Sequence, residues 1–147
     1  MIIGIPKEIM PGENRVAATP ATVKEMISLG LTVLVEISAG SGSYIDDQDY
    51  IDAGAKIVDS ASAVFNQADI ILKVKEPLFN YNTGKHEADM MHAGQYLITF
   101  IHPAAPVNHD MVRKLAKNGV NAITLDGIPR ISRAQNTAQC SGSNRRK

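Results

Sequence analysis

The sequence has little cysteine, no net charge and no long apolar run, and each absence excludes a class of protein. The single cysteine, Cys140, excludes an internal disulfide and suits a reducing compartment. The formal net charge is zero, so bulk electrostatics indicate no nucleic-acid partner. No apolar run approaches the roughly 18 residues that a membrane span needs, and the "MIIGI" start lacks the plan of a signal peptide. We therefore expect a soluble, cytoplasmic domain.

The chain does contain an alternation of β-branched runs and helix-like segments. Strands are expected at 2–5, 31–37, 56–58, 69–74, 96–101 and 120–125, and helices at 21–29, 46–55, 61–67, 86–94 and 107–118. Thr19 and Pro20 give the first helix an N-cap and an early proline. The spacings suit parallel crossovers. We therefore predict an α/β fold, a doubly wound, mostly parallel sheet with helices on both faces.

One glycine-rich turn, "AGSGSYI" at 39–45, looks like a dinucleotide-binding loop because it follows an expected strand and precedes an expected helix. However, Ile45 stands where the fingerprint requires a third Gly or Ala. We interpret the segment as a small-residue turn. The expected fold is therefore Rossmann-like or flavodoxin-like, without the true dinucleotide fingerprint.

Basic side chains follow most of the expected strands. Arg15 follows the first, Lys73 and Lys75 end the fourth, His102 follows the fifth, and Arg130 follows the sixth. The carboxyl ends of parallel strands meet at one edge of a sheet. Arg and Lys can hold a carboxylate there, and a histidine can shuttle a proton. The pattern predicts a shared site, although surface charges after strands remain an alternative reading.

The other histidines, His86, His92 and His109, lack the spacing of metal ligands. We interpret them as surface residues and expect no metal site.

Several motifs, in order, resemble one known family. "GIPKEIMPGENRVAATP", "AGAKIV", "ILKVKEP" and "IPRISRAQ" are similar to the N-terminal domain shared by alanine dehydrogenase and the alpha subunit of proton-translocating NAD(P) transhydrogenase. The resemblance covers about residues 1–135. In the alanine dehydrogenase branch it implies that Arg15 and Lys75 hold pyruvate and that His102 is the acid-base.

The loop "PRISRAQ" resembles the transhydrogenase branch instead. There, the arginine and glutamine contact the nicotinamide end of NAD(H), and Arg130 and Gln135 match them. The resemblance therefore favours a transhydrogenase alpha subunit, which takes part in hydride transfer from NADH to NADP+ coupled to proton translocation. In that branch Arg15, Lys75 and His102 are inherited pocket architecture.

The family continues past this loop into a Rossmann domain, whereas this chain ends in "NTAQCSGSNRRK". We expect the family domain at 1–135 and an unstructured, non-family tail at 136–147, as a frameshift or truncated gene would produce. The resemblance implies an NAD-binding domain or chain as the missing partner, with membrane and NADP-binding subunits and a homodimer in the complete protein, peripheral to the inner membrane. We expect this chain alone to be inactive and to bind NAD(H) weakly. An alanine dehydrogenase-like fragment and a non-enzymatic docking module remain alternatives.

Overall fold

The computed structural model describes residues 1–129, so Arg130, Gln135 and the predicted tail lie outside the described part. The strands are β1 (Ile2–Ile5), β2 (Thr32–Glu36), β3 (Lys56–Val58), β4 (Ile70–Leu72), β5 (Phe79–Asn80), β6 (Lys85–His86), β7 (Tyr96–Thr99) and β8 (Asn121–Thr124). The α-helices are α1 (Pro20–Ser28), α2 (Asp47–Asp52), α3 (Ala61–Gln67), α4 (Glu87–Met90) and α5 (His109–Lys117). Short 3₁₀ turns, η1 (Ser41–Ser43) and η2 (Pro106–Asn108), join some of them.

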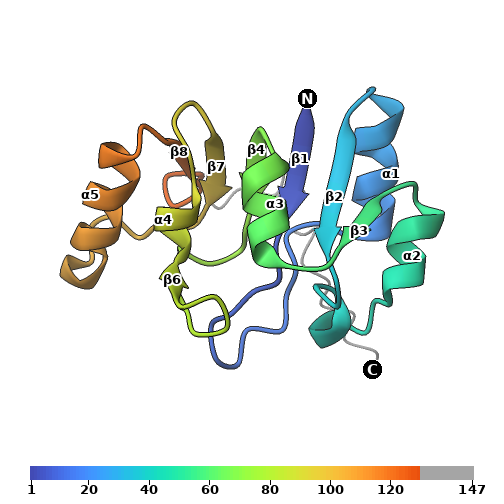
Figure 1. Ribbon diagram of the computed structural model, residues 1–147, viewed down its shortest axis with the longest axis horizontal. Helices are drawn as coiled ribbons and strands as arrows, with labels where there is room; N and C mark the ends of the chain where they lie inside the picture. The colour runs from blue at the N-terminus through green and yellow to red at the C-terminus, as the bar shows by residue number, and fades with distance from the viewer. Residues whose placement is uncertain (130–147) are drawn as a thin grey trace.

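Six of the strands form one sheet in the order β3-β2-β1-β4-β7-β8, and every neighbouring pair in it is parallel (Figure 1). The chain starts at the centre, runs outward to β3, and returns to build the other half from β4. This confirms the predicted doubly wound, parallel α/β fold. The order reverses between β1 and β4, and in such sheets ligands bind outside the carboxyl ends of the strands at this switch point.

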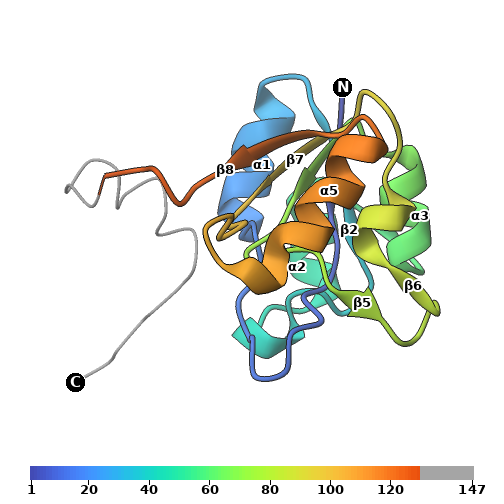
Figure 2. The same ribbon diagram turned by 90° about the vertical axis from the view of Figure 1, so that its left-hand side faces the viewer.

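The two faces of the sheet carry separate apolar cores, because successive side chains of a strand point to opposite faces. Ile3 and Ile5 of β1 pack with Val23 of α1 on one face. Gly4 faces the other way, and a Cβ added there would lie 2.7 Å from the Cβ of Ala68 at the end of α3. Figure 2 shows α1 and α3 on opposite sides of the sheet. Glycine at this position lets α3 approach β1 closely.

The helix that leads away from the switch point begins where the sequence predicts. The Thr19 side chain accepts a hydrogen bond from the backbone N–H of Thr22, and Pro20 occupies the first turn. Proline costs little there because the first-turn N–H groups have no partner within the helix. The start of α1 is therefore fixed locally.

The region 79–94 differs from the prediction. The expected helix at 86–94 is only the four-residue α4, and the preceding residues form a short antiparallel hairpin, β5–β6. Met91 is already extended, with φ −86° and ψ 153°, and Gly94 has a positive φ of 82°. The prediction failed here because the backbone leaves the helix early in spite of the apolar "MM" run.

Candidate functional site

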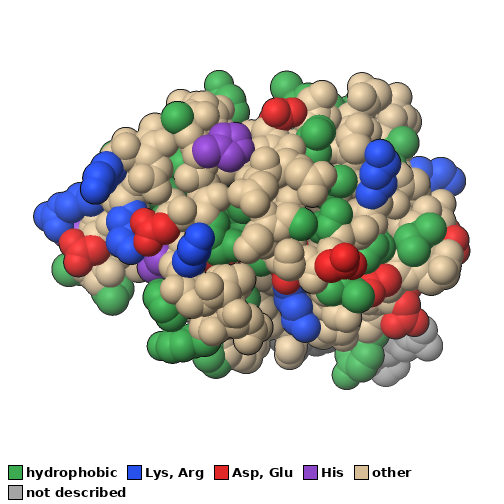
Figure 3. All heavy atoms as spheres, in the orientation of Figure 1, with side chains coloured by type: hydrophobic (Ala, Val, Ile, Leu, Met, Phe, Trp, Pro, Cys, Tyr) green, Lys and Arg blue, Asp and Glu red, His purple; other side chains and the backbone are tan. Residues whose placement is uncertain are grey.

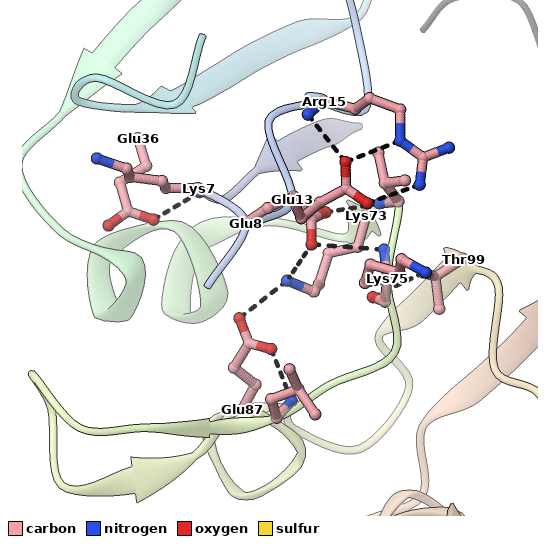
Figure 4. Close-up of polar contacts among 11 residues, drawn as sticks. Lys7, Glu8, Glu13, Arg15, Glu36, Lys73, Lys75, Glu87 and Thr99 are labelled. Atoms are coloured by element: carbon pink, nitrogen blue, oxygen red, sulfur yellow. Dashed lines mark hydrogen bonds and ion pairs between the residues drawn. The ribbon is translucent and has the colours of Figure 1, made fainter. Parts of the chain in front are cut away.

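Arg15 lies in the long connection between β1 and α1, on the switch-point edge of the sheet (Figure 4). Its guanidinium makes a bidentate contact with the Glu13 carboxylate, in which Nε donates to Oε1 at 2.7 Å and Nη2 donates to Oε2 at 2.6 Å. The backbone N–H of Arg15 also donates to Glu13 Oε1, at 2.9 Å. This two-point contact is the geometry in which arginine holds a carboxylate.

The Glu13–Arg15 pair is half sheltered from solvent. The Glu13 side chain is only 7% exposed, while that of Arg15 is 45% exposed. The side-chain hydrogen bond from Arg15 lowers the pKa of Glu13 to about 2, and the nearby charge of Lys75 acts in the same direction. Glu13 is therefore a fixed anion at this edge, and Arg15 keeps nearly half of its side chain exposed to solvent.

Lys75 lies just beyond the end of β4 and is half-buried. Its backbone carbonyl accepts a hydrogen bond from the Thr99 hydroxyl at 2.9 Å, and its N–H donates to Glu8 Oε2 at 3.4 Å. Within residues 1–129, its Nζ makes no hydrogen bond or ion pair. Lys75 is thus a held but unpaired cation.

Lys73 belongs to a different arrangement from Lys75, although the sequence placed both in one site. Its side chain is fully buried, and Nζ donates to Glu87 Oε1 at 3.0 Å and to Glu8 Oε2 at 3.3 Å. The Glu8 carboxylate also accepts from the backbone N–H of Val74 at 2.6 Å. We call Glu8, Lys73 and Glu87 the buried triad. It ties the β1–α1 connection to the end of β4 and to the start of α4 (Figure 4).

The buried triad holds one positive charge between two carboxylates. Burial opposes the charge on Lys73, but the attraction of Glu87 and Glu8 outweighs it and holds the pKa of Lys73 above its ordinary value. Burial raises the pKa of Glu87, with Lys73 only partly offsetting it. Lys73 is therefore a charged structural residue, unavailable to a ligand.

His102 follows β7 and lies between two carboxylates. Its Nδ1 is 3.5 Å from Glu76 Oε2, and its Nε2 is 3.4 Å from Asp126 Oδ1. Glu76 Oε2 is buried and has no hydrogen-bond partner within residues 1–129. The backbone of His102 is left-handed, with φ 49°, and its N–H donates to Asp126 Oδ2 at 2.7 Å. Asp126 therefore anchors the backbone of His102 and lies beside its ring.

Asp126 is itself held by several donors. Thr124 Oγ1 and the backbone N–H of Ile101 also donate to its carboxylate. Burial works against the charge, but these hydrogen bonds outweigh it and lower the pKa of Asp126 below its ordinary value. The ionised carboxylate joins the carboxyl ends of β7 and β8.

The glycine-rich turn at 39–45 supports the loop that carries Arg15. A Cβ at Gly42 would lie 2.8 Å from the carbonyl oxygen of Asn14, and Ser43 Oγ donates to the same carbonyl at 2.7 Å. The helix that follows starts with Asp46, Asp47 and Asp49, which repel a phosphate. The packing at Gly42 supports its interpretation as a small-residue turn.

The structure brings the candidate residues Arg15, Lys75 and His102 to the same edge, at the ends of three neighbouring strands. Arg130 and Gln135 lie outside the described residues and stay predictions. The carboxylates beside these cations were not among the predicted site residues. Glu8, Glu13 and Glu76 each lie within two residues of a basic residue in sequence, which is the one signal that pointed to them.

The remaining histidines differ from one another. His86, predicted as a surface residue, is half-buried and caps α4, because its Nδ1 accepts from the backbone N–H of Ala88 at 3.1 Å. Burial lowers the pKa of His86. His92 and His109 are exposed, as predicted. Within residues 1–129, no group of three or more His, Cys, Asp and Glu side chains is placed to hold a metal ion.

A separate hollow of about 550 Å³ lies between the β1–α1 connection and the β5–β6 hairpin, lined by Ile9, Pro11 and residues 78–82. It contains none of the three basic candidates.

Acidic and basic side chains are interspersed on the face seen in Figure 3. No helix within residues 1–129 is long and apolar enough to cross a membrane.

Residues 4–143 match the family described as alanine dehydrogenase/PNT, N-terminal domain. The chain belongs to this family. Among relatives of the alanine dehydrogenase/PNT N-terminal domain, the NAD(P) transhydrogenase subunit alpha of Haemophilus influenzae is 41% identical over 135 residues, which cover 92% of this chain and 24% of that protein. The alanine dehydrogenase of Methanococcus maripaludis is 47% identical over 104 residues, covering 71% of this chain and 26% of that protein.

Solved structures of the alanine dehydrogenase/PNT family have the same fold. The transhydrogenase of Sinorhizobium meliloti is similar with a TM-score of 0.78 and 36% identity, over 92% of this chain and 38% of that one. An L-alanine dehydrogenase is similar with a TM-score of 0.75 and 39% identity, over 84% and 32%. The chain thus spans about a quarter to two fifths of the length of these relatives.

Proposed function

We propose that residues 1–135 form the first domain of a transhydrogenase-type alpha subunit. In this role the carboxyl-end edge of the sheet is one wall of the site where NADH gives a hydride to NADP+. The other wall, with the dinucleotide fingerprint, belongs to a separate domain or chain. Residues 1–135 by themselves are not expected to catalyse the reaction or to bind NAD(H) tightly.

One observation favours transhydrogenation over the oxidation of an amino acid. Both ring nitrogens of His102 face carboxylates, Glu76 on one side and Asp126 on the other. Hydride exchange between two nicotinamides transfers no proton, so it needs no free histidine. Oxidation of an amino acid to a keto acid does require acid-base help through an imine. An imidazole that lies between two carboxylates, at 3.5 and 3.4 Å, is compatible with the first reaction.

Within this proposal, the predicted nicotinamide-positioning residues are Arg130 and Gln135. Arg15, Lys75 and His102 are the inherited pocket. Membrane-embedded and NADP-binding subunits complete the enzyme. In this proposal the domain lies on the cytoplasmic side, peripheral to the inner membrane, and the complete protein is a homodimer.

A second candidate is an alanine dehydrogenase-type reaction. It is favoured by Arg15, Lys75 and His102 lying at one edge, since Arg15 and Lys75 suit a carboxylate. In that reaction His102 would exchange one of its carboxylate contacts for the substrate.

A chimaera tests the proposal. Residues 1–135 replace the matching first domain of the Haemophilus influenzae alpha subunit, and the complex is assayed for NADH-to-NADP+ hydride transfer and for alanine oxidation. We expect hydride transfer without alanine oxidation, and little change on His102→Ala. A folded chimaera that oxidises alanine, or that loses hydride transfer on His102→Ala, overturns the proposal.

A further inference from the structure

We propose that His86 is an acid-sensitive helix cap: its neutral ring joins the β5–β6 hairpin to the first turn of α4, and protonation of the ring breaks that link. The His86 cap involves none of the candidate site residues Arg15, Lys75 and His102. It does not depend on which reaction the domain takes part in. Its consequence is that the hairpin and α4 separate more easily in acid than at neutral pH.

His86 belongs to two elements, because it ends β6 and directly precedes α4 (Figure 1). In the hairpin it is the partner of Phe79 on β5. At the start of α4 its Nδ1 accepts a hydrogen bond from the backbone N–H of Ala88 at 3.1 Å. The first N–H groups of a helix have no partner within it, so this ring nitrogen satisfies one of them. One side chain therefore links the hairpin to the helix.

The caps of α1 and α3 use hydroxyl oxygens instead of an imidazole. Thr19 and Ser60 each accept from a backbone N–H three residues later. A hydroxyl remains an acceptor throughout the pH range in which histidine titrates. A neutral imidazole has one acceptor nitrogen, whereas both nitrogens of an imidazolium are donors. On protonation, the Nδ1–H of His86 faces the N–H of Ala88, and the cap is lost.

The surroundings of the ring keep it neutral near pH 7. Burial lowers the pKa of His86, and Lys114 on α5 lowers it further, while Asp89 on α4 raises it. Lys114 and Asp89 form an ion pair at 2.7 Å that joins α5 to α4. The folded protein therefore takes up this proton less readily than the unfolded chain, where the pKa has its ordinary value of 6.5. The stabilisation by the cap is complete above pH 6.5 and is lost as the pH falls below it.

The other charged groups of the neighbouring elements have different partners or directions. Glu87 directs its carboxylate to Lys73 and to a backbone N–H that precedes β5. Lys85 is exposed, and as the neighbour of His86 in β6 it projects from the opposite face of the hairpin. The elements α3 and β5, which also contact α4 or β6, contain no charged residue. The ion pair between α4 and α5 therefore supplies the charges that act on the ring.

Protonation leaves the neighbouring contacts of the hairpin in place. The backbone N–H of Glu87 donates to the carbonyl oxygen of Leu78 at 2.8 Å, and the N–H of Leu78 donates to Glu87 Oε2 at 2.9 Å. Neither bond involves the imidazole. The N–H of Ala88 is therefore the group whose protection from hydrogen exchange depends on the cap, and the N–H of Leu78 is an internal reference.

Hydrogen exchange of the full 147-residue chain, followed by NMR at about pH 7.5 and about pH 5.5, tests the cap. Rates are expressed as protection factors, which remove the intrinsic pH dependence of exchange. His86→Asn supplies a side-chain oxygen that can cap α4 and does not titrate. His92→Asn is the matched control, because the same substitution removes an exposed imidazole.

We expect the protection of the Ala88 N–H in the wild type to fall about fivefold at the lower pH, as the loss of one helix cap does. The protection of Leu78 should change by less than about twofold. His86→Asn should remove the fall at Ala88, and His92→Asn should keep it.

The titration of the His86 ring gives a second measurement. It should move to higher pH in Lys114→Gln, which removes a repelling charge, and to lower pH in Asp89→Asn, which removes an attracting one. In both variants, the pH at which Ala88 loses its protection should move with the ring.

The proposal is overturned if the protection of Ala88 in the wild type does not change with pH. It is also overturned if the fall persists in His86→Asn or disappears in His92→Asn. If His86→Asn does not fold, Lys114→Gln and Asp89→Asn decide. A midpoint at Ala88 that does not follow the titration of the ring then shows that the imidazole does not control this contact.

Discussion

Lys73 Nζ donates to Glu87 Oε1 at 3.0 Å, and both side chains are completely buried. Glu8 shares the same ammonium group at 3.3 Å. The buried triad therefore joins three segments of the chain around one positive charge. Removing one member of such a group leaves the others charged and unpaired in a low-dielectric interior.

Lys73→Met should destabilise the protein by about 3–5 kcal/mol, because Glu8 and Glu87 lose their shared cation. Urea denaturation followed by circular dichroism measures this free energy of unfolding. Lys75→Met is the control, since its Nζ has no ion pair within residues 1–129, and we expect a change within about 0.5 kcal/mol. Equal losses in the two variants would contradict the role of the triad.

The stability of the wild type should fall more steeply in acid than that of Glu13→Gln. The pKa of Glu13 is lowered from 4.5 to about 2, so the folded state holds this carboxylate ionised more strongly than the unfolded chain does. The stabilisation is present above pH 4.5 and is lost as the pH falls toward 2. Because Arg15 is 45% exposed, we expect about 1–2 kcal/mol at most after solvent screening. Parallel curves of unfolding free energy against pH for the two proteins would refute this.

Gly42→Ala should destabilise the protein by about 1–3 kcal/mol through overpacking. The new methyl group would lie 2.8 Å from the backbone oxygen of Asn14, which cannot move without shifting the loop of Arg15. Thermal unfolding measures the effect, and the Arg15 Nε–H resonance should move with it. Gly127→Ala is the control, because a Cβ there meets nothing within 4 Å. If Gly42→Ala leaves the stability unchanged, the turn accommodates the methyl group without strain, which would contradict the prediction.

The isolated chain should bind NAD(H) too weakly for micromolar detection by calorimetry. Its only glycine-rich turn within residues 1–129 uses Gly42 for packing and leads into an acidic helix start. The chimaera, which carries the rest of an NAD(P) transhydrogenase subunit alpha, is the positive control. Micromolar binding by the chain alone would require a site that this turn does not explain.

In the chimaera, Arg130→Ala and Gln135→Ala should slow hydride transfer more than they weaken NADH binding. Most of the affinity is expected from the adenine and pyrophosphate ends, while these side chains orient the reacting ring. A misplacement of about 1 Å can cost on the order of a hundredfold in rate. Single-turnover rates and NADH titrations separate the two effects. Loss of affinity without loss of rate would contradict a positioning role.

The sequence predicted the sheet well because its strands are short β-branched runs with local start and stop signals. The cap at Thr19 and Pro20 places α1 correctly. The β5–β6 hairpin was not predicted because its strands are only two residues long. The pattern of "EADMM" suggested a longer helix than α4. The pattern of apolar residues does not show where the backbone leaves the helical conformation.

The sequence identified the cations of the candidate site but not their different roles. Lys73 and Lys75 are two residues apart, yet one is buried and the other has no ion pair within residues 1–129. The difference depends on Glu8, which is 65 residues from Lys73 in sequence. Such long-range pairing leaves no local signal.

The central place of β1 has a consequence for synthesis on the ribosome. The N–H of Ile2 donates to the side chain of Asp69, 67 residues later, immediately before β4. At about 5–20 residues per second, β1 emerges roughly 3–13 s before this partner exists. During that interval the apolar run Ile2–Ile5 can pair only with β2, so one edge of the nascent sheet stays open until β4 leaves the exit tunnel.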